Sequence, residues 1–173
     1  DEAIVVAGEV IKMQPPVAND LRRVSWTVVA HGQFDLEHYP RAERAYLELR
    51  AMGPGEGFAP AELDERIAAS VYRQAEAYQA SGDVDAAVAD YLRVATVAPG
   101  SSIRANATYD AATLLINESR WEDSVAVLNR FRRSYPEHEF ADDVTKKLAV
   151  AYKESGQLSN AAVEFEKIAA MND

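Results

Sequence analysis

The chain has 173 residues, of which 48% are hydrophobic, so it can bury a sizeable core, and 28 acidic against 18 basic residues give a net charge of −10. This acidic balance argues against binding to the phosphate backbone of nucleic acids or to anionic membranes, and no apolar run approaches the roughly 18 residues of a membrane-spanning helix. Cysteine is absent, which excludes disulfides, thiol catalysis and cysteine-ligated zinc.

Helix-forming residues dominate the whole chain. It contains 31 alanines, whereas glycine (8) and proline (7) are few and fall at intervals. Alanine has the highest helix propensity, and its small side chain lets two helices approach closely. No long alternation of valine, isoleucine or threonine between turn residues indicates a strand. We therefore expect an all-α chain.

The N-terminal third is predicted to hold one and a half helical units and a loop. Residues 2–14 have the pattern of the second helix of a unit, which makes them a half repeat, and residues 17–54 form a first, looser repeat. Residues 53–60 (GPGEGFAP) form a loop or hinge. Pro60 suits the first position of the following helix, where no N–H donor is needed.

Residues 61–99 form the clearest repeat. Its two helices are predicted at residues 68–81 and 84–97. Gly82 lies just past the first of them, where a left-handed backbone suits glycine best. The unit therefore consists of a helix, a tight turn, a second helix and a turn that contains proline.

Small and large residues in this unit have separate packing roles. Ala75 and Ala87 are predicted to lie where the two helices cross, because a larger side chain there would force the helices apart. Tyr78 and Tyr91 are predicted to supply bulk on either side of the crossing.

The same pattern returns in residues 101–136 and 138–173. Equivalent residues are 37 positions apart in four columns, namely Ala75/Ala112/Ala149, Gly82/Ser119/Gly156, Ala87/Ser124/Ala161 and Tyr91/Leu128/Phe165. Because several independent columns share one period, the chain is predicted to be a repeat array.

These columns resemble the tetratricopeptide repeat family, whose motif covers about 34 positions. The motif residues of the clearest unit are Val71, Ala75, Tyr78, Gly82, Ala87, Tyr91, Val94 and Pro99. Glu37 and Ser119 stand where the family has a turn glycine. The resemblance implies one right-handed superhelix, an α-solenoid, with about four helical hairpins plus an N-terminal helix. Half-units at both ends indicate a fragment of a longer array.

The linker Tyr135-Pro136-Glu137-His138, followed by Ala141, is similar to that of bacterial envelope members of the family. Examples are the Tol–Pal-associated cell-division coordinator and the β-barrel assembly lipoprotein. This similarity implies a periplasmic or cell-envelope location, with the cytoplasm as the alternative.

No catalytic, metal or cofactor site is predicted. The histidines His31 and His38 are separated by a turn, so they need not share a face. The glycine-rich loop has neither the preceding strand nor the Lys-Ser/Thr of a phosphate-binding loop. Paired carboxylates lie at helix beginnings and are interpreted as caps: Asp83/Asp85, Glu122/Asp123 and Asp142/Asp143. Arg130, Arg132 and Arg133 suit the negative pole of a helix end.

The resemblance implies that the protein functions through a binding surface. Stacked helix pairs curve, and in the family the first helices line the concave groove. Carried over column by column, the groove positions give the candidate partner-binding residues Thr27, His31, Phe34, Tyr72, Glu76, Gln79, Asn106, Tyr109, Thr113, Asn117, Lys146 and Lys153, with Asp35, Ile116, Asp143, Val150 and Glu154 in the same columns.

We therefore expect a non-catalytic scaffold or adaptor that binds a peptide segment or a protein surface. Tyr72 and Tyr109 occupy equivalent positions, and they either contact the ligand or pack between units. The lysine and asparagine clamp of chaperone-tail binders is not assembled in this chain. The alternative is a polysaccharide-guiding or regulatory segment of a secretion or export apparatus, in which Phe34, Tyr72 and Tyr109 stack on sugar rings.

Overall fold

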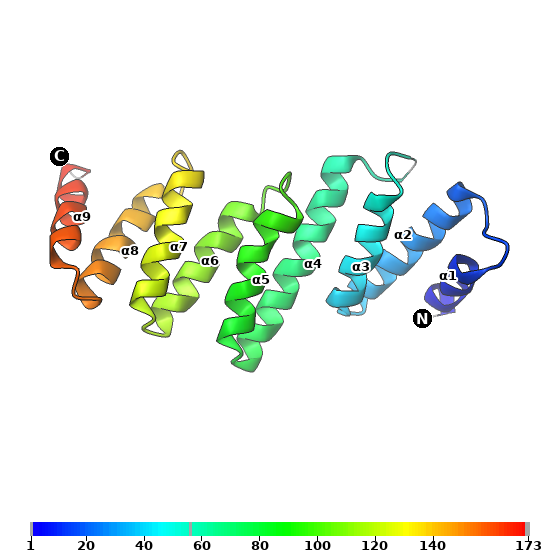
Figure 1. The fold of residues 1–173 in the computed structure, drawn as a ribbon, viewed down its shortest axis with the longest axis horizontal. Coiled ribbons are helices and arrows are strands. Elements are labelled where there is room, and N and C mark those ends of the chain that lie inside the picture. Colours follow the sequence, from blue (N-terminus) through cyan, green and yellow to red (C-terminus); the bar gives the residue numbers. More distant parts are fainter. Residues whose placement is uncertain (1, 56, 172–173) are drawn as a thin grey trace.

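A computed structural model describes residues 2–55 and 57–171. Within these ranges the chain forms nine α-helices and no strand, which confirms the expected all-α class (Figure 1). The helices are α1 (Glu2–Lys12), α2 (Asn19–Asp35), α3 (Tyr39–Ala51), α4 (Pro60–Ser81), α5 (Val84–Val97), α6 (Arg104–Asn117), α7 (Trp121–Ser134), α8 (Ala141–Glu154) and α9 (Leu158–Ala170).

The helices stack into an elongated array with two layers. Each helix packs against its neighbours in the sequence, and the two ends of the chain lie at opposite ends of the array (Figure 1). The first helices of the hairpins, α2, α4, α6 and α8, form one layer, and their partners α3, α5, α7 and α9 form the other. The arrangement confirms the α-solenoid of about four hairpins plus an N-terminal helix.

Small residues lie at the helix crossings, as predicted. Ala75 and Ala87 have no solvent exposure, and the equivalent Ala112, Ser124 and Ala149 are likewise fully buried. A side chain larger than alanine at these points would overlap the facing helix, which explains why the columns carry alanine or serine.

The bulky column is buried only where a following hairpin covers it. Tyr91 is 3% exposed and Leu128 is fully buried, whereas Phe165 on α9 is 48% exposed because no later helix of the described chain packs over it. The prediction for Tyr78 was wrong. Its side chain, in the last turn of α4, is 39% exposed, whereas the equivalent Leu115 on α6 is 1% exposed.

All four hairpin turns contain a residue with left-handed backbone. Gly82 has φ +81° and Gly156 has φ +76°, which confirms the role expected for glycine at these turns. Glu37 (φ +59°) and Ser119 (φ +55°) adopt the same conformation without glycine. The turn geometry therefore belongs to the repeat and is imposed even where the side chain disfavours it.

The first helix of the clearest repeat is longer than predicted. It begins at Pro60 rather than at residue 68 and has 22 residues, against 14 each in α6 and α8. Pro60 does occupy the start of the helix, as expected. The added turns carry Asp64, which accepts a hydrogen bond from the Gly100 N–H (2.9 Å), and Glu65, which accepts from the Ser101 hydroxyl (2.7 Å).

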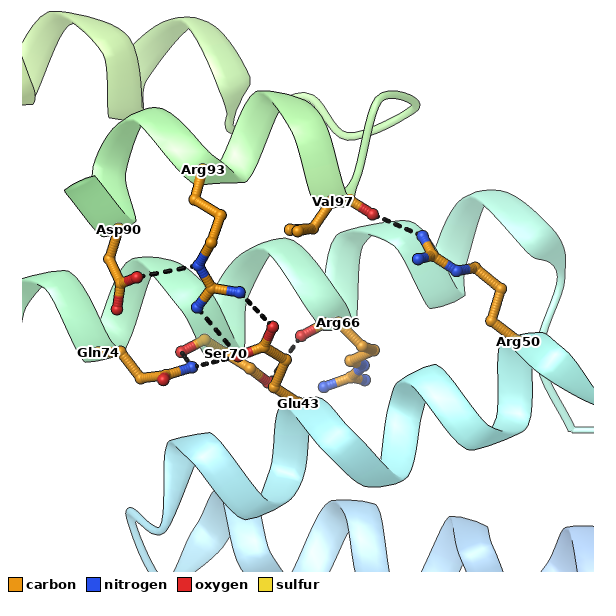
Figure 2. A network of polar contacts seen from close by, with 8 residues as sticks. All are labelled: Glu43, Arg50, Arg66, Ser70, Gln74, Asp90, Arg93 and Val97. Carbon is orange, nitrogen blue, oxygen red and sulfur yellow. Dashed lines mark hydrogen bonds and ion pairs between the residues drawn. The ribbon is translucent and has the colours of Figure 1, made fainter.

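Ion pairs join consecutive hairpins through the second-helix layer. Glu43 on α3 accepts two hydrogen bonds from Arg93 on α5 (2.5 and 3.1 Å), and Gln74 on α4 donates a third (2.7 Å) (Figure 2). Arg132 on α7 makes a similar two-pronged contact with Glu164 on α9 (2.9 and 2.6 Å). These pairs connect hairpins in addition to the apolar packing.

Candidate binding surface on the first helices

The predicted groove residues lie on α2, α4, α6 and α8, and we call the surface that they form the first-helix surface. Since these four helices belong to one layer, residues from different repeats can act together on it. The arrangement suits an elongated ligand that crosses several repeats.

Two tyrosines link consecutive first helices. The Tyr72 hydroxyl on α4 donates to the Asp110 carboxylate on α6 (2.5 Å). One repeat later, the Tyr109 hydroxyl on α6 donates to Asp143 on α8 (2.5 Å). Tyr72 and Tyr109 therefore pack between units, which was one of the two roles expected for them.

Burial and the neighbouring carboxylates keep both tyrosines protonated. Burial and the hydrogen bond to Asp143 raise the pKa of Tyr109 to about 12, and the pKa of Tyr72 is raised by the same two effects, with Asp110 as the acceptor. Burial also raises the pKa of Asp110, although the Tyr72 hydrogen bond opposes this shift. At neutral pH the hydroxyls therefore act as donors across the gap between repeats.

The tyrosine rings are held by further contacts. Tyr72 packs edge-on against Tyr91 (centroids 5.1 Å apart), and Tyr109 packs against Phe140 (4.4 Å). The Lys147 ammonium lies 5.3 Å from the centroid of the Tyr109 ring and 3.6 Å from Asp143. Both rings therefore lie at the first-helix surface and are held in place by the side chains that contact them.

Two hollows lie among the predicted residues. One of about 240 Å³ lies between α6 and α8 and is lined by Ile116, Lys146, Lys147 and Val150. Another of about 440 Å³ lies between α1 and α2, and Thr27, His31 and Asp35 are among its lining residues. The groove columns therefore border concave features at two places along the surface.

Several predicted residues already serve the fold. The His31 ring packs against Tyr46 and Phe58 (6.0 and 5.3 Å), and its Nε2 atom is buried without a hydrogen-bond partner among the described residues. Phe34 packs edge-on against Tyr39 (5.3 Å). The Thr27 hydroxyl donates to the Arg23 carbonyl (3.0 Å), and Gln79 accepts a hydrogen bond from the Tyr91 hydroxyl (2.9 Å). The Oγ1 atom of Thr113 is buried.

A second group of predicted residues faces solvent. Asn106, Asn117, Lys146 and Lys153 are exposed. Val150 is 45% exposed beside Lys146, which places an apolar side chain among polar ones. Glu76 is half-buried and pairs with Arg73 (2.7 Å). All four of these exposed polar residues thus lie on α6 and α8.

The acceptor role of Asp110 was not predicted. Asp110 directly follows Tyr109, and Tyr109 is the equivalent of Tyr72 in the next repeat. This position in the sequence could have indicated the role. Asp143 was expected as a groove residue and as a cap, and it acts as the acceptor for Tyr109. Within the described residues α8 has no side-chain cap hydrogen bond.

The capping interpretation holds for one carboxylate of the three pairs. Asp83 accepts from the Ala86 N–H (3.1 Å) and caps α5. Asp85 and Asp123 instead pair with Arg120. Arg132 lies in the last turn of α7, as expected, and it also binds the buried Glu164.

The residues of the 135–140 linker form an aromatic cluster. His138 packs edge-on against Phe131 (5.5 Å) and Phe140 (4.9 Å), and Tyr135 packs against Phe131 (5.2 Å). Phe140 also packs against Tyr109, so the linker helps to hold this residue of the first-helix surface in place.

Across residues 2–55 and 57–171, no group of three or more histidine or acidic side chains is placed to hold a metal ion. None of the helices there combines the length and the apolarity that crossing a membrane requires.

Residues 69–101, which comprise most of α4, all of α5 and the turn after it, match the family model of the tetratricopeptide repeat. This part of the chain is a repeat of the tetratricopeptide type. The other repeats share its helix pairs, its left-handed turns and its buried small residues.

One of the similar solved structures supports the fold of this chain. BtubC from P. vanneervenii aligns with a TM-score of 0.51 at 16% identity, over 98% of this chain and 72% of that one. The kinesin light chain repeats of Podosopora anserina (TM-score 0.49, 19% identity, 99% and 86% covered) and MamA of AMB-1 (0.47, 14%, 98% and 80%) are also similar. The BtubC likeness supports the fold alone, and no curated protein matches the sequence significantly.

Proposed function

We propose that this protein is a non-catalytic scaffold whose first-helix surface is a concave groove that binds a peptide segment or a protein surface. The observation that carries the proposal is the hollow between α6 and α8, because three residues predicted from the groove columns, Ile116, Lys146 and Val150, line it. An apolar recess with polar groups at its rim suits the anchor side chain of a bound peptide.

The polysaccharide alternative is less well supported. Stacking on sugars needs open aromatic faces, whereas Phe34 packs against Tyr39 and Tyr72 packs against Tyr91. Tyr109 lies between Phe140 and Lys147. The exposed amide and ammonium groups of α6 and α8 favour a peptide, whose backbone and side chains they can hydrogen-bond.

The finer proposal is that the scaffold works in a bacterial envelope complex. It rests on the sequence of the 135–138 linker. Fractionation of cells that express the complete gene with a C-terminal tag would test it. Recovery of the tagged protein in the cytoplasm alone would contradict it.

The binding proposal can be tested with a displayed library of random peptides selected on the purified chain. We expect the enriched peptides to lose at least tenfold in affinity when Lys146→Glu and Val150→Glu are introduced together, because these changes remove the recess and reverse its charge. Arg130→Glu, on an exposed residue of α7, is the matched control and should leave binding unchanged. Enriched peptides that bind the α8 double variant as tightly as the native chain would overturn the groove assignment.

A further inference from the structure

A separate cavity of about 350 Å³ lies at one edge of the array, where α2 and α3 meet the start of α4. We call it the edge pocket, and its lining includes Arg23, Arg50, Phe58, Pro60, Ala61 and Leu63. The carboxylate of Asp64, the partner of Arg50, also lines it. The pocket shares no lining residue with the hollow between α6 and α8 and contains no predicted groove residue. Its volume falls in the range of roughly 300–1,000 Å³ that is typical of small-ligand sites.

The edge pocket is an addition to the repeat. It depends on Gly53, Pro54 and Phe58, which precede α4, and on the extra N-terminal turns of α4, which α6 and α8 do not have. The extra turns are also held in place, because Asp64 and Glu65 accept hydrogen bonds from the turn between α5 and α6. The pocket therefore has walls that the repeat pattern alone does not require.

Its inner wall is apolar and anchored in the core. Phe58 packs against His31 (5.3 Å) and edge-on against the buried Tyr46 (6.1 Å). Leu63 is 6% exposed and belongs to the main hydrophobic core. With Pro60 and Ala61 these side chains offer a rigid surface to an apolar group.

Its charge is positive, in a protein whose net charge is −10. Arg50 is neutralised by Asp64 (3.3 Å) and donates to the Val97 carbonyl (2.6 Å), a bond drawn in Figure 2. Arg23 contacts carbonyl oxygens through one terminal nitrogen, those of Met52 (3.3 Å), Gly53 (2.7 Å) and Pro54 (3.4 Å).

Arg23 therefore differs from Arg50 in its partners. Among the residues that the structure describes, no carboxylate pairs with it. A guanidinium has five N–H donors in a planar fork that matches a carboxylate. The carbonyl bonds hold the group in place through Nη2, and Nε lies against Gly55, so Nη1 is the nitrogen that can donate to a ligand.

We propose that the edge pocket binds an apolar carboxylate, with its aromatic or branched aliphatic part against Phe58, Ala61 and Leu63 and its carboxylate on Arg23. The shared chemistry can come from a free organic acid or from the C-terminal residue of a peptide. Charge-assisted hydrogen bonds to arginine are about twice as strong as neutral ones, so the acid is preferred over its uncharged counterpart.

The test uses 3-phenylpropanoate and its amide, and a tetrapeptide that ends in phenylalanine with a free or an amidated C-terminus. Binding to the complete chain at pH 7 is measured by chemical-shift changes in NMR titrations. We expect one or both free carboxylates to bind at least tenfold more tightly than the matching amide. The pair that binds identifies the source. Equal affinity for acids and amides, or no binding of either acid, would overturn the proposal.

Two variants locate the bound acid. Arg23→Gln should weaken binding at least tenfold, whereas Arg41→Gln, at an exposed position of α3, should not change it. Since Arg23 also holds the 53–60 connection, Ala61→Leu supplies a second variant that fills the pocket without removing a hydrogen bond, and it should abolish binding. An acid that still binds Ala61→Leu at native affinity lies elsewhere, which contradicts the assignment. Both variants leave Lys146 and Val150 unchanged, so this result is independent of the peptide selection.

Discussion

Single turn residues carry backbone strain in this protein. Ser119 and Glu37 occupy the left-handed conformation that Gly82 and Gly156 occupy in the other two turns. For a residue with a Cβ atom this conformation costs roughly 1–2 kcal/mol, whereas glycine adopts it freely but loses more entropy on folding. The two effects oppose each other, and the steric one is larger at these positions.

We expect Ser119→Gly to raise the free energy of unfolding by about 0.5 kcal/mol and Gly82→Ala to lower it by about 1 kcal/mol. Urea denaturation followed by circular dichroism measures both changes. Ser155→Gly is the control, because Ser155 has φ −81° next to a turn and gains no relief of strain from glycine. A stabilisation by Ser155→Gly equal to that of Ser119→Gly would contradict the explanation.

At the scale of helices, buried carboxylates join one hairpin to the next. Burial raises the pKa of Glu43, but hydrogen bonds from Arg93 and Gln74 outweigh this effect, so the pKa is lowered overall. Glu164 shows the same balance, with Arg132 and Lys167 as donors. A carboxyl group whose pKa is lower in the folded state stabilises the fold above its unfolded pKa, and this contribution is lost as the pH falls through the folded value.

Glu43→Gln is therefore expected to lower the free energy of unfolding by about 1–3 kcal/mol at pH 7, because Arg93 loses its charged partner. The deficit relative to the native chain should begin to shrink as the pH falls below the ordinary glutamate pKa of 4.5, where the unfolded chain takes up a proton, and should vanish below the lower pKa of the folded state, where native Glu43 is itself protonated. Denaturation curves between about pH 3 and about pH 7, which lie on either side of that value, measure the change. Glu48→Gln, at an exposed position of the same helix, should have little effect at any of these pH values. A deficit for Glu43→Gln that does not vary with pH would argue against the ion pair.

At the scale of the whole molecule, stability is distributed along the array. Each helix packs against its neighbours in the sequence, so a repeat is stabilised by its own hairpin and by the adjoining ones. Exposed large apolar side chains gather near the two ends, with Val5, Val6 and Val24 at one and Val163 and Phe165 at the other. An internal repeat therefore loses more contacts than a terminal one when it is disrupted.

Ala87→Trp and Ala149→Trp should each separate a hairpin and lower helicity and melting temperature, with a loss of about 3 kcal/mol from overpacking. Hydrogen exchange should then distinguish the two sites. Ala149→Trp is expected to leave α2 to α5 protected, whereas Ala87→Trp exposes amides on both sides of α5. Ala162→Trp, at an exposed position of α9, is the control. Native stability in both buried variants would contradict the packing described for the crossings.

The local pattern of residues was sufficient to predict the helices, the crossings and the turns. A buried alanine column, a glycine after a helix and a proline at its start act within one hairpin, so their effects can be derived from spacing alone. The groove columns also led to Ile116, Lys146 and Val150, which line one hollow. Tyr78 and the start of α4 were misplaced, because exposure at a hairpin end and the added turns depend on what neighbouring segments cover.

Contacts between repeats were decided by the tertiary structure. Tyr72 and Tyr109 are equivalent in sequence, yet Asp110 and Asp143, their acceptors, occupy different columns of the repeat, in which Asp110 aligns with Lys147 and Asp143 with Asn106. The acceptor that each hydroxyl meets depends on the rotation and stagger between adjacent hairpins. The same holds for the edge pocket, which exists because α2, α3 and the lengthened α4 converge around the 53–60 connection. Periodicity specifies each hairpin, whereas the relative placement of hairpins depends on packing between residues far apart in the chain.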